Sequence, residues 1–210
     1  RIRGTNYPRG YKQEPMEEFI DRSLINLGID CIDLLQLHCP PSEICSKKKT
    51  YEMMDEIVKK GKIAHYGVSV HKISDAMEAI QNPNVKSIQM IFNIFRQKPI
   101  TELFDDAKTK GVSLIVRLPL ASGLLGGKLN PNVSFPENDH RLFNSDGQCF
   151  NVGETFAGIP FTIGLDIVEE LKKMIPDGMT LAQMSLRWIL DFDAVTVVIP
   201  GSKSPLQIPD

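Results

Sequence analysis

The sequence predicts an α/β fold, the later part of a parallel (β/α)8 barrel, of which this 210-residue chain holds about the last five βα units. Three observations lead to this prediction. Helical and strand patterns alternate strictly and are joined by short turns that contain glycine, which is typical of parallel βα units. The strands are almost continuously apolar, as in sheets covered on both faces. Polar residues collect just past the strand ends, positions that share one rim of a barrel.

The first predicted unit is the helix Glu14–Leu27 followed by the strand Cys31–Leu37. Phe19 and Leu24 lie at helical spacing, acidic residues occupy the first turn, and Gly28 is a stop signal. The later elements repeat this unit and are predicted, in chain order, as helix Thr50–Lys60, strand His65–Ser69, helix Ser74–Ile80, strand Ser87–Ile91, helix Ile100–Lys110, strand Val112–Val116, helices Gly164–Met174 and Leu181–Leu190, and strand Val195–Ile199.

Two architectures fit this alternation of elements. A doubly wound open sheet would usually carry a GxGxxG turn early in the chain, and the sequence contains none. The barrel interpretation also explains the polar strand ends, and residues 1–210 are therefore expected to form a single domain, a partial barrel. Five strands do not close a barrel of eight, so three further units, roughly 90 residues, are expected ahead of Arg1.

Composition excludes several classes of protein. With 42% hydrophobic residues, 24% charged residues and a formal net charge of −2, the chain shows no electrostatic footprint for nucleic acid. No apolar run approaches the ~20 residues that cross a bilayer, so no membrane partner is expected. The four cysteines lack zinc-ligand spacing, which predicts no metal site and a cytoplasmic protein with reduced thiols. The sequence makes no prediction of oligomeric state.

Three polar residues near strand ends could carry chemistry. His38 could donate to a ligand carbonyl or relay a proton near neutral pH, or it could be a core histidine bonded to backbone. Arg117 needs a partner, either an internal salt bridge or a ligand on which its planar guanidinium stacks. Gln89 lies among apolar neighbours, must be satisfied by hydrogen bonding, and could bind an amide.

Two loops combine small residues with a cation. The loop Pro119–Lys128 follows one strand directly, and Ile199–Ser204 ends another. Backbone amides in such loops can approach an anion closely, so the pair predicts a phosphate-bearing ligand that straddles the rim. His65, His71 and His140 stand alone among polar neighbours and are expected to be solvated or locally bonded.

Four stretches together resemble the aldo-keto reductase superfamily over essentially the whole chain, and they are Ile32–Pro40 (IDLLQLHCP), Gly61–Ser69 (GKIAHYGVS), Pro119–Lys128 (PLASGLLGGK) and Ile199–Lys203 (IPGSK). The likeness is strongest to bacterial-type members that also carry an insertion like Asn151–Phe156 (NVGETF). The resemblance implies an NADPH-dependent oxidoreductase on a TIM barrel. Such an enzyme reduces a small-molecule aldehyde or ketone through an Asp, Tyr, Lys, His tetrad.

The resemblance assigns roles to residues of this chain. His38 matches the catalytic histidine that orients the substrate carbonyl, Ser69 and Gln89 match positions that bind the carboxamide, and Arg117 replaces an aromatic ring that packs on the nicotinamide. The remaining cofactor residues are Leu120, Ser122, Gly123 and Lys128 in the loop over the pyrophosphate, Arg141 as a further phosphate contact, and Gly201, Ser202, Lys203 and Gln207 around the adenosine 2′-phosphate.

The sequence departs from the family pattern in two respects. The tetrad's Asp, Tyr and Lys have no counterpart here, and Val70 replaces the Asn that usually accompanies Ser69. An alternative is therefore a catalytically inactive NADP(H)-binding regulatory relative, or a non-functional fragment. The long segment 129–164 is expected to cover the cofactor or the substrate mouth, because long connections in compact domains are often functional.

Overall fold

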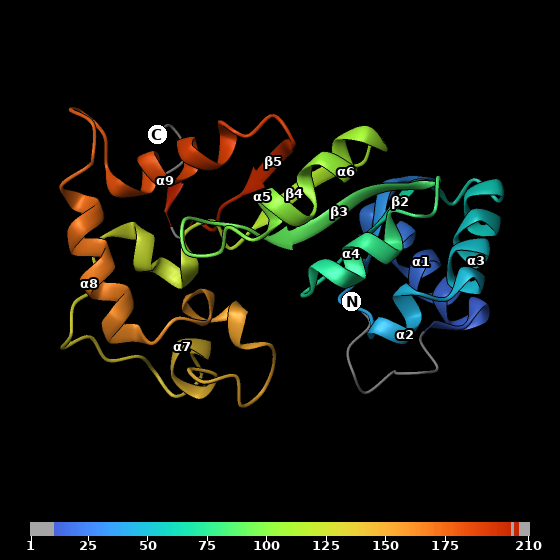
Figure 1. Ribbon diagram of the computed structural model, residues 1–210. Helices are drawn as coiled ribbons and strands as arrows, with labels where there is room; N and C mark the ends of the chain where they lie inside the picture. The colour runs from blue at the N-terminus through green and yellow to red at the C-terminus, as the bar shows by residue number, and fades with distance from the viewer. Residues whose placement is uncertain (1–10, 203, 206–210) are drawn as a thin grey trace. The chain divides into compact units, whose positions relative to one another are not determined.

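The structure is a computed structural model, and it describes residues 11–202 and 204–205. Five parallel strands form one sheet in the order β1-β2-β3-β4-β5, which confirms the predicted α/β fold class (Figure 1). The strands are β1 (Ile32–His38), β2 (Ile63–Ser69), β3 (Val85–Ile91), β4 (Ser113–Arg117) and β5 (Val195–Ile199). The helices are α1 (Gln13–Leu27), α2 (Ser42–Cys45), α3 (Lys48–Lys59), α4 (Ile73–Ala79), α5 (Pro99–Glu102), α6 (Phe104–Thr109), α7 (His140–Phe143), α8 (Phe161–Lys172) and α9 (Leu181–Leu190).

One predicted helix is interrupted. The helix expected over Ile100–Lys110 forms as α5 and α6, separated at Leu103. The backbone of Leu103 has φ −138° and ψ −35°, which is outside the helical region, and its side chain is buried. No helix in the described ranges combines the length and the apolar character that a membrane span requires.

The chain divides into two compact units, which are described separately. The first contains the described residues of 1–89 and 102–114, and the second those of 90–101 and 115–210. A single domain over residues 1–210 stays a prediction.

In the first unit, β1 and β2 pair in parallel with His38 opposite Ser69 at their carboxyl ends. α3 contacts β2 and buries Met54 and Ile57 on one face, because these side chains recur at helical spacing. α1 ends at Gly28, whose φ of 67° is left-handed, as the stop signal predicts.

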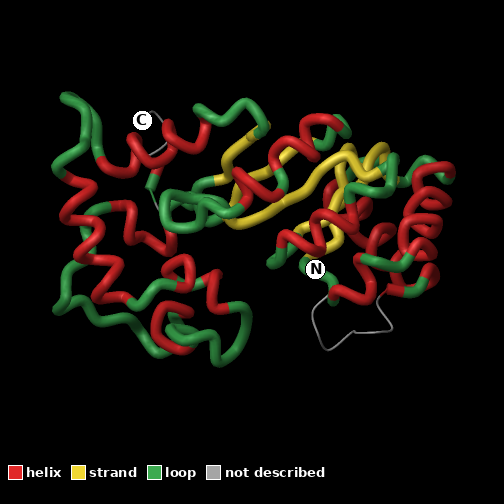
Figure 2. The backbone as a smooth tube through the Cα atoms, viewed as in Figure 1, coloured by secondary structure: helices red, strands yellow, loops and turns green. Residues whose placement is uncertain are grey.

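In the second unit, α8 and α9 pack against the short 3-10 helix η3 (Ala121–Gly126), and α9 also packs on β5. An apolar cluster that includes Leu124, Leu125 and Phe156 forms the core around η3. Figure 2 shows that the chain between η3 and α8 runs mostly as loop, interrupted by short helical turns. This stretch includes most of segment 129–164, whose last residues, from Phe161 on, form the first turn of α8.

A buried asparagine organises segment 129–164. Asn144 is fully buried and donates from Nδ2 to the Thr155 hydroxyl at 3.1 Å. Its Oδ1 accepts from the amides of Cys149 and Phe150 at 2.9 and 2.8 Å. One side chain therefore joins three points of the segment, which gives a loop without long helices a defined conformation.

Replacing Asn144 with Ala is expected to open this segment locally. Two partly buried backbone N–H groups lose their acceptor, at a cost of about 2 kcal/mol, so amide exchange of Cys149 and Phe150 accelerates roughly 30-fold. Hydrogen exchange resolved by residue measures this effect. The control is Gln148→Ala, because Gln148 is exposed and its side chain bonds no described residue other than Asp146. Unchanged exchange in Asn144→Ala would contradict the organising role.

Candidate functional site

A cavity of about 790 Å3 opens in the second unit where β4 and β5 end. Three segments far apart in the chain form it: the loop after β4, the turn that leads into α7, and the end of β5. The lining residues are Leu118, Pro119, Leu120, Ser122, Gly123, Asn138, Asp139, His140, Arg141, Phe143, Ile199, Gly201 and Ser202.

The loop after β4 has an unusual backbone. Leu118, Ala121 and Ser122 have positive φ values of 53°, 47° and 57°, and Gly123 follows with 100°. Non-glycine residues rarely adopt this region, and such strain gathers at ligand sites. No residue of the described ranges accepts a hydrogen bond from the Ser122 amide, whereas the Gly123 amide donates to the carbonyl of Leu120 at 2.9 Å. A residue that lines the cavity thus carries a backbone N–H without an acceptor in the described chain.

The Ser122 hydroxyl joins this loop to segment 129–164. It donates to the carbonyl of Glu154 at 2.9 Å and accepts from the Phe156 amide at 3.2 Å. The His140 Nε2 lies 3.4 Å from the same oxygen. Because the single hydroxyl proton is committed to Glu154, the backbone N–H is the donor that Ser122 can offer to a ligand.

Arg141 is held in place from two sides. Its Nε and Nη2 donate to the carboxylate of Asp139 at 3.0 and 2.6 Å, and its guanidinium lies 4.3 Å from the centroid of the Phe135 ring. The Nη1 group faces the loop after β4, since a Cβ built on Gly123 would lie 3.7 Å from it. The bidentate pair and the aromatic ring therefore fix the side chain while leaving Nη1 toward the loop.

The same pair predicts a pH dependence. Hydrogen bonding from Arg141 lowers the pKa of Asp139 from 3.8 to about 2. A lowered pKa in the folded state means that the ion pair contributes fully above pH 3.8 and is lost as the pH falls toward 2. In a carboxyl-carbon NMR titration, we expect Asp139 to titrate near pH 2 in the wild type and at a clearly higher pH in Arg141→Ala. A midpoint that stays near 2 in the variant would rule out Arg141 as the cause.

Arg117, at the end of β4, forms an internal salt bridge. Its Nη1 lies 2.9 Å from Glu154 Oε1, and its side chain is 12% exposed. Of the two partners expected for Arg117, an internal salt bridge or a stacked ligand, the structure thus contains the salt bridge. The bridge ties the strand end to segment 129–164, beside the contact that the Glu154 carbonyl makes with Ser122.

In the first unit, a row of polar side chains crosses the carboxyl ends of three strands. Ser69 Oγ lies 3.4 Å from Gln89 Oε1, Gln89 Nε2 donates to Gln36 Oε1 at 2.7 Å, and Gln36 Nε2 donates to Ser87 Oγ at 3.1 Å. His38 is exposed and stands in register with Ser69. Three residues predicted for the site, on three neighbouring strands, therefore lie together.

The structure brings most of the predicted cofactor residues of the second unit together. Six of them line the cavity, namely Leu120, Ser122, Gly123, Arg141, Gly201 and Ser202. Lys128 is exposed and does not line the cavity, because the chain has already passed η3 at that point. The predictions for Lys203 and Gln207 concern residues outside the described ranges.

Sequence reasoning missed several residues. Asp139, Phe143 and His140 line the cavity, although His140 was expected to be only solvated or locally bonded. A signal for Asp139 existed, because an Asp before a short helix is a capping residue, and Asp139 accepts from the Arg141 amide at 2.9 Å. Gln36 was missed because a single Gln in an apolar strand has no partner that the local sequence reveals.

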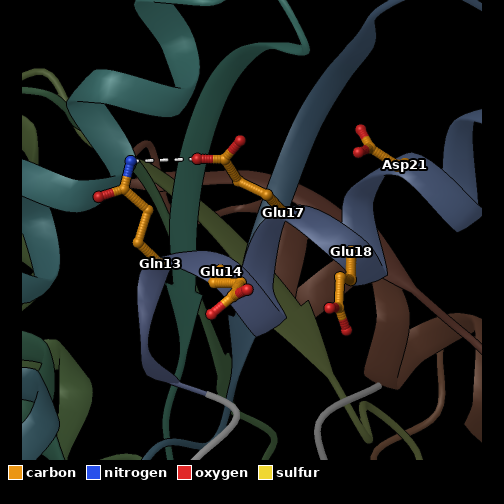
Figure 3. A pocket seen from close by; sticks show the side chains of 5 residues that line it. All are labelled: Gln13, Glu14, Glu17, Glu18 and Asp21. Carbon is orange, nitrogen blue, oxygen red and sulfur yellow. Dashed lines mark hydrogen bonds between the residues drawn. The ribbon is translucent and has the colours of Figure 1, made fainter.

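A second hollow, of about 460 Å3, lies on α1 and differs in chemistry (Figure 3). It is lined by four carboxylates and Gln13, and Figure 3 shows Gln13 donating to Glu17. Glu17 and Asp21 each pair with a lysine at 2.6 Å. Partly exposed surface pairs of this kind contribute little to stability, and the hollow is a charged helix surface.

A parallel α/β sheet with a cavity where its strands end is the arrangement found in α/β proteins of the barrel class. The sequence profile of the Aldo/keto reductase family matches residues 3–210, so the chain belongs to this family.

Named relatives agree with this assignment. Aldo-keto reductase str7 of Strobilurus tenacellus is 31% identical over 206 residues, which are 93% of this chain and 57% of that protein. Aldo-keto reductase yakc [NADP(+)] of Schizosaccharomyces pombe is 27% identical over 90% of this chain and 54% of its own length. The holo form of aldo-keto reductase AKR11C1 from Bacillus halodurans superposes with a TM-score of 0.69 and 26% identity, over 95% of this chain and 60% of that structure. The chain thus spans little more than half the length of these relatives.

Proposed function

We propose that this chain is the cofactor-binding part of an NADPH-dependent oxidoreductase that reduces an aldehyde or ketone to an alcohol. The observation that supports this most is the cavity, because six residues selected for cofactor binding come from distant segments and line one space. Membership of the Aldo/keto reductase family supports the same chemistry. The reduced nicotinamide would supply hydride to the carbonyl carbon.

The phosphates of the cofactor would bind at the loop after β4. The Ser122 amide has no acceptor within the described part of the chain, and the Arg141 Nη1 faces the same loop. An amide dipole and a guanidinium are the donors that phosphate oxygens prefer. The residues present therefore fit a diphosphate.

The carboxamide of the nicotinamide would bind in the first unit. Gln89 uses one N–H on Gln36 and shares its carbonyl with Ser69, so one N–H and an acceptor position remain for a ligand. Val70 offers no side-chain hydrogen bond there. Its backbone amide donates to the backbone carbonyl of Gln89 at 2.9 Å, which leaves the Gln89 side chain unaffected. Arg117 would pack on the nicotinamide ring, and His38 would orient the substrate carbonyl.

The preference for NADPH over NADH rests on the end of β5. Gly201 and Ser202 line the cavity, and Lys203 follows them in the sequence. A cation there would favour the additional phosphate of NADPH. The name of the yakc protein, which states NADP(+), supports the same preference.

The test is a titration of the chain with NADPH and NADH, followed by protein fluorescence, together with aldehyde-dependent oxidation of NADPH. We expect NADPH to bind more tightly than NADH. Oxidation would establish the enzyme, whereas binding without oxidation would contradict the enzyme assignment for this chain and support an NADP(H)-binding relative. Absence of binding would contradict the cofactor site itself.

A further inference from the structure

A tight turn after β3 places a second arginine near Arg117. The Arg96 amide donates to the carbonyl of Asn93 at 2.8 Å, and the Asn93 Oδ1 accepts from the Phe95 amide at 3.1 Å. Asn93 is fully buried, and its Nδ2 donates to the carbonyl of Leu118 at 2.9 Å. The turn that carries Arg96 is thus attached to the end of β4, next to Arg117.

The two guanidinium groups reach adjacent residues of segment 129–164. A Cβ built on Gly153 would lie 2.9 Å from Arg96 Cζ, so the Arg96 guanidinium packs on bare backbone there. The next residue, Glu154, holds Arg117 Nη1 at 2.9 Å. Two cationic side chains from different turns therefore converge at Gly153 and Glu154.

Arg96 differs from Arg117 in its bonding. Within residues 11–202 and 204–205, no group forms a hydrogen bond or ion pair with the Arg96 guanidinium, although the side chain is half-buried. Burial and the charge of Arg117 lower the pKa of Arg96, whereas the nearby Glu154 carboxylate, which pairs with Arg117, raises it. A guanidinium has five N–H donors, and partial loss of water without a protein acceptor leaves them unsatisfied.

We propose that Arg96, together with Arg117, forms a binding site for the carboxylate of a small carbonyl substrate, which makes Arg96 a specificity-determining residue for anionic carbonyl compounds of the 2-oxo acid class. The planar fork of a guanidinium matches the two oxygens of a carboxylate in a bidentate pair. This inference rests on the proposed function, because Arg117 is the residue proposed to pack on the nicotinamide. A carboxylate held at Arg96 would then place the adjoining carbonyl near the ring.

The experiment compares pyruvate with its uncharged methyl ester by calorimetry, with and without NADP+. These probes share one carbonyl and differ in one charge. We expect the wild type to bind pyruvate at least roughly 10-fold more tightly than the ester, and Arg96→Met to lose this preference while its NADP+ affinity stays within about twofold. Equal binding of the two probes by the wild type, or pyruvate binding unchanged in Arg96→Met, would overturn the proposal.

A second variant retains Arg96 but displaces its guanidinium. In Gly153→Ala the new methyl group occupies the place of the Arg96 guanidinium. We expect the same loss of pyruvate preference, with circular dichroism showing a folded chain. A retained preference would overturn the proposal even if Arg96→Met were poorly folded. Failure of the proposed cofactor site appears separately, as absent NADP+ binding with pyruvate binding intact.

Discussion

Gly67→Ala is expected to lower the free energy of unfolding by about 3 kcal/mol, which corresponds to roughly 6–12 °C in Tm. A Cβ at Gly67 would lie 2.5 Å from the carbonyl oxygen of Ser87 on the neighbouring strand and would also meet the Ser87 hydroxyl. The φ of Gly67 is not positive, so its backbone conformation does not require glycine. The close approach of the two strands is what requires a residue without a side chain. Backbone of a paired strand cannot yield as a flexible side chain can.

The control for this prediction is Gly126→Ala, since nothing lies within 4 Å of a Cβ at that position. Urea unfolding of both variants measures the difference. A double variant, Gly67→Ala with Ser87→Gly, removes the hydroxyl but keeps the carbonyl oxygen, and we expect it to stay destabilised. Full recovery in the double variant would show that the side chain, and not the backbone, is the obstacle.

Arg141→Ala is expected to raise the Kd for NADPH roughly 10- to 100-fold, because a charge-assisted hydrogen bond is worth about 1.5–3 kcal/mol. The Arg141 Nη1 faces the loop after β4, and this loop carries the Ser122 amide. Removing Arg141 also leaves the Asp139 carboxylate at the cavity without its bidentate partner. The unpaired negative charge of this carboxylate would repel phosphate. Fluorescence titration measures the change.

The matched control is Arg187→Ala, which removes an exposed arginine paired with Asp191 at 2.8 Å, and its Kd should equal that of the wild type. The double variant Asp139→Asn with Arg141→Ala separates the two causes. If the unpaired Asp139 carboxylate causes part of the lost NADPH affinity, the double variant regains that part. The part that it does not regain is due to the missing Arg141 side chain. An Arg141→Ala chain that binds NADPH within about twofold of the wild type would exclude Arg141 from the phosphate site.

Local patterns predicted the elements well where hydrophobic periodicity is strong. The helix Leu181–Leu190 and the strand Val195–Ile199 form with the predicted bounds. The interruption at Leu103 has no signal in the local pattern, which predicts one helix over Ile100–Lys110. Lys128 shows the same limit for the site: a loop motif includes it, but the direction of the chain after η3 leaves it exposed.

The sequence by itself determined the parallel α/β class, the order of the elements, and the residues that follow strand ends, because these depend on period and on turn chemistry. Only the tertiary structure decided which polar groups are already paired. It joined Arg117 to Glu154 and Gln89 to Gln36, pairs separated by 37 and 53 residues. A partner from another segment leaves no trace in local spacing. Free donors such as the Ser122 amide and the Arg96 guanidinium therefore appear only once the described chain is folded.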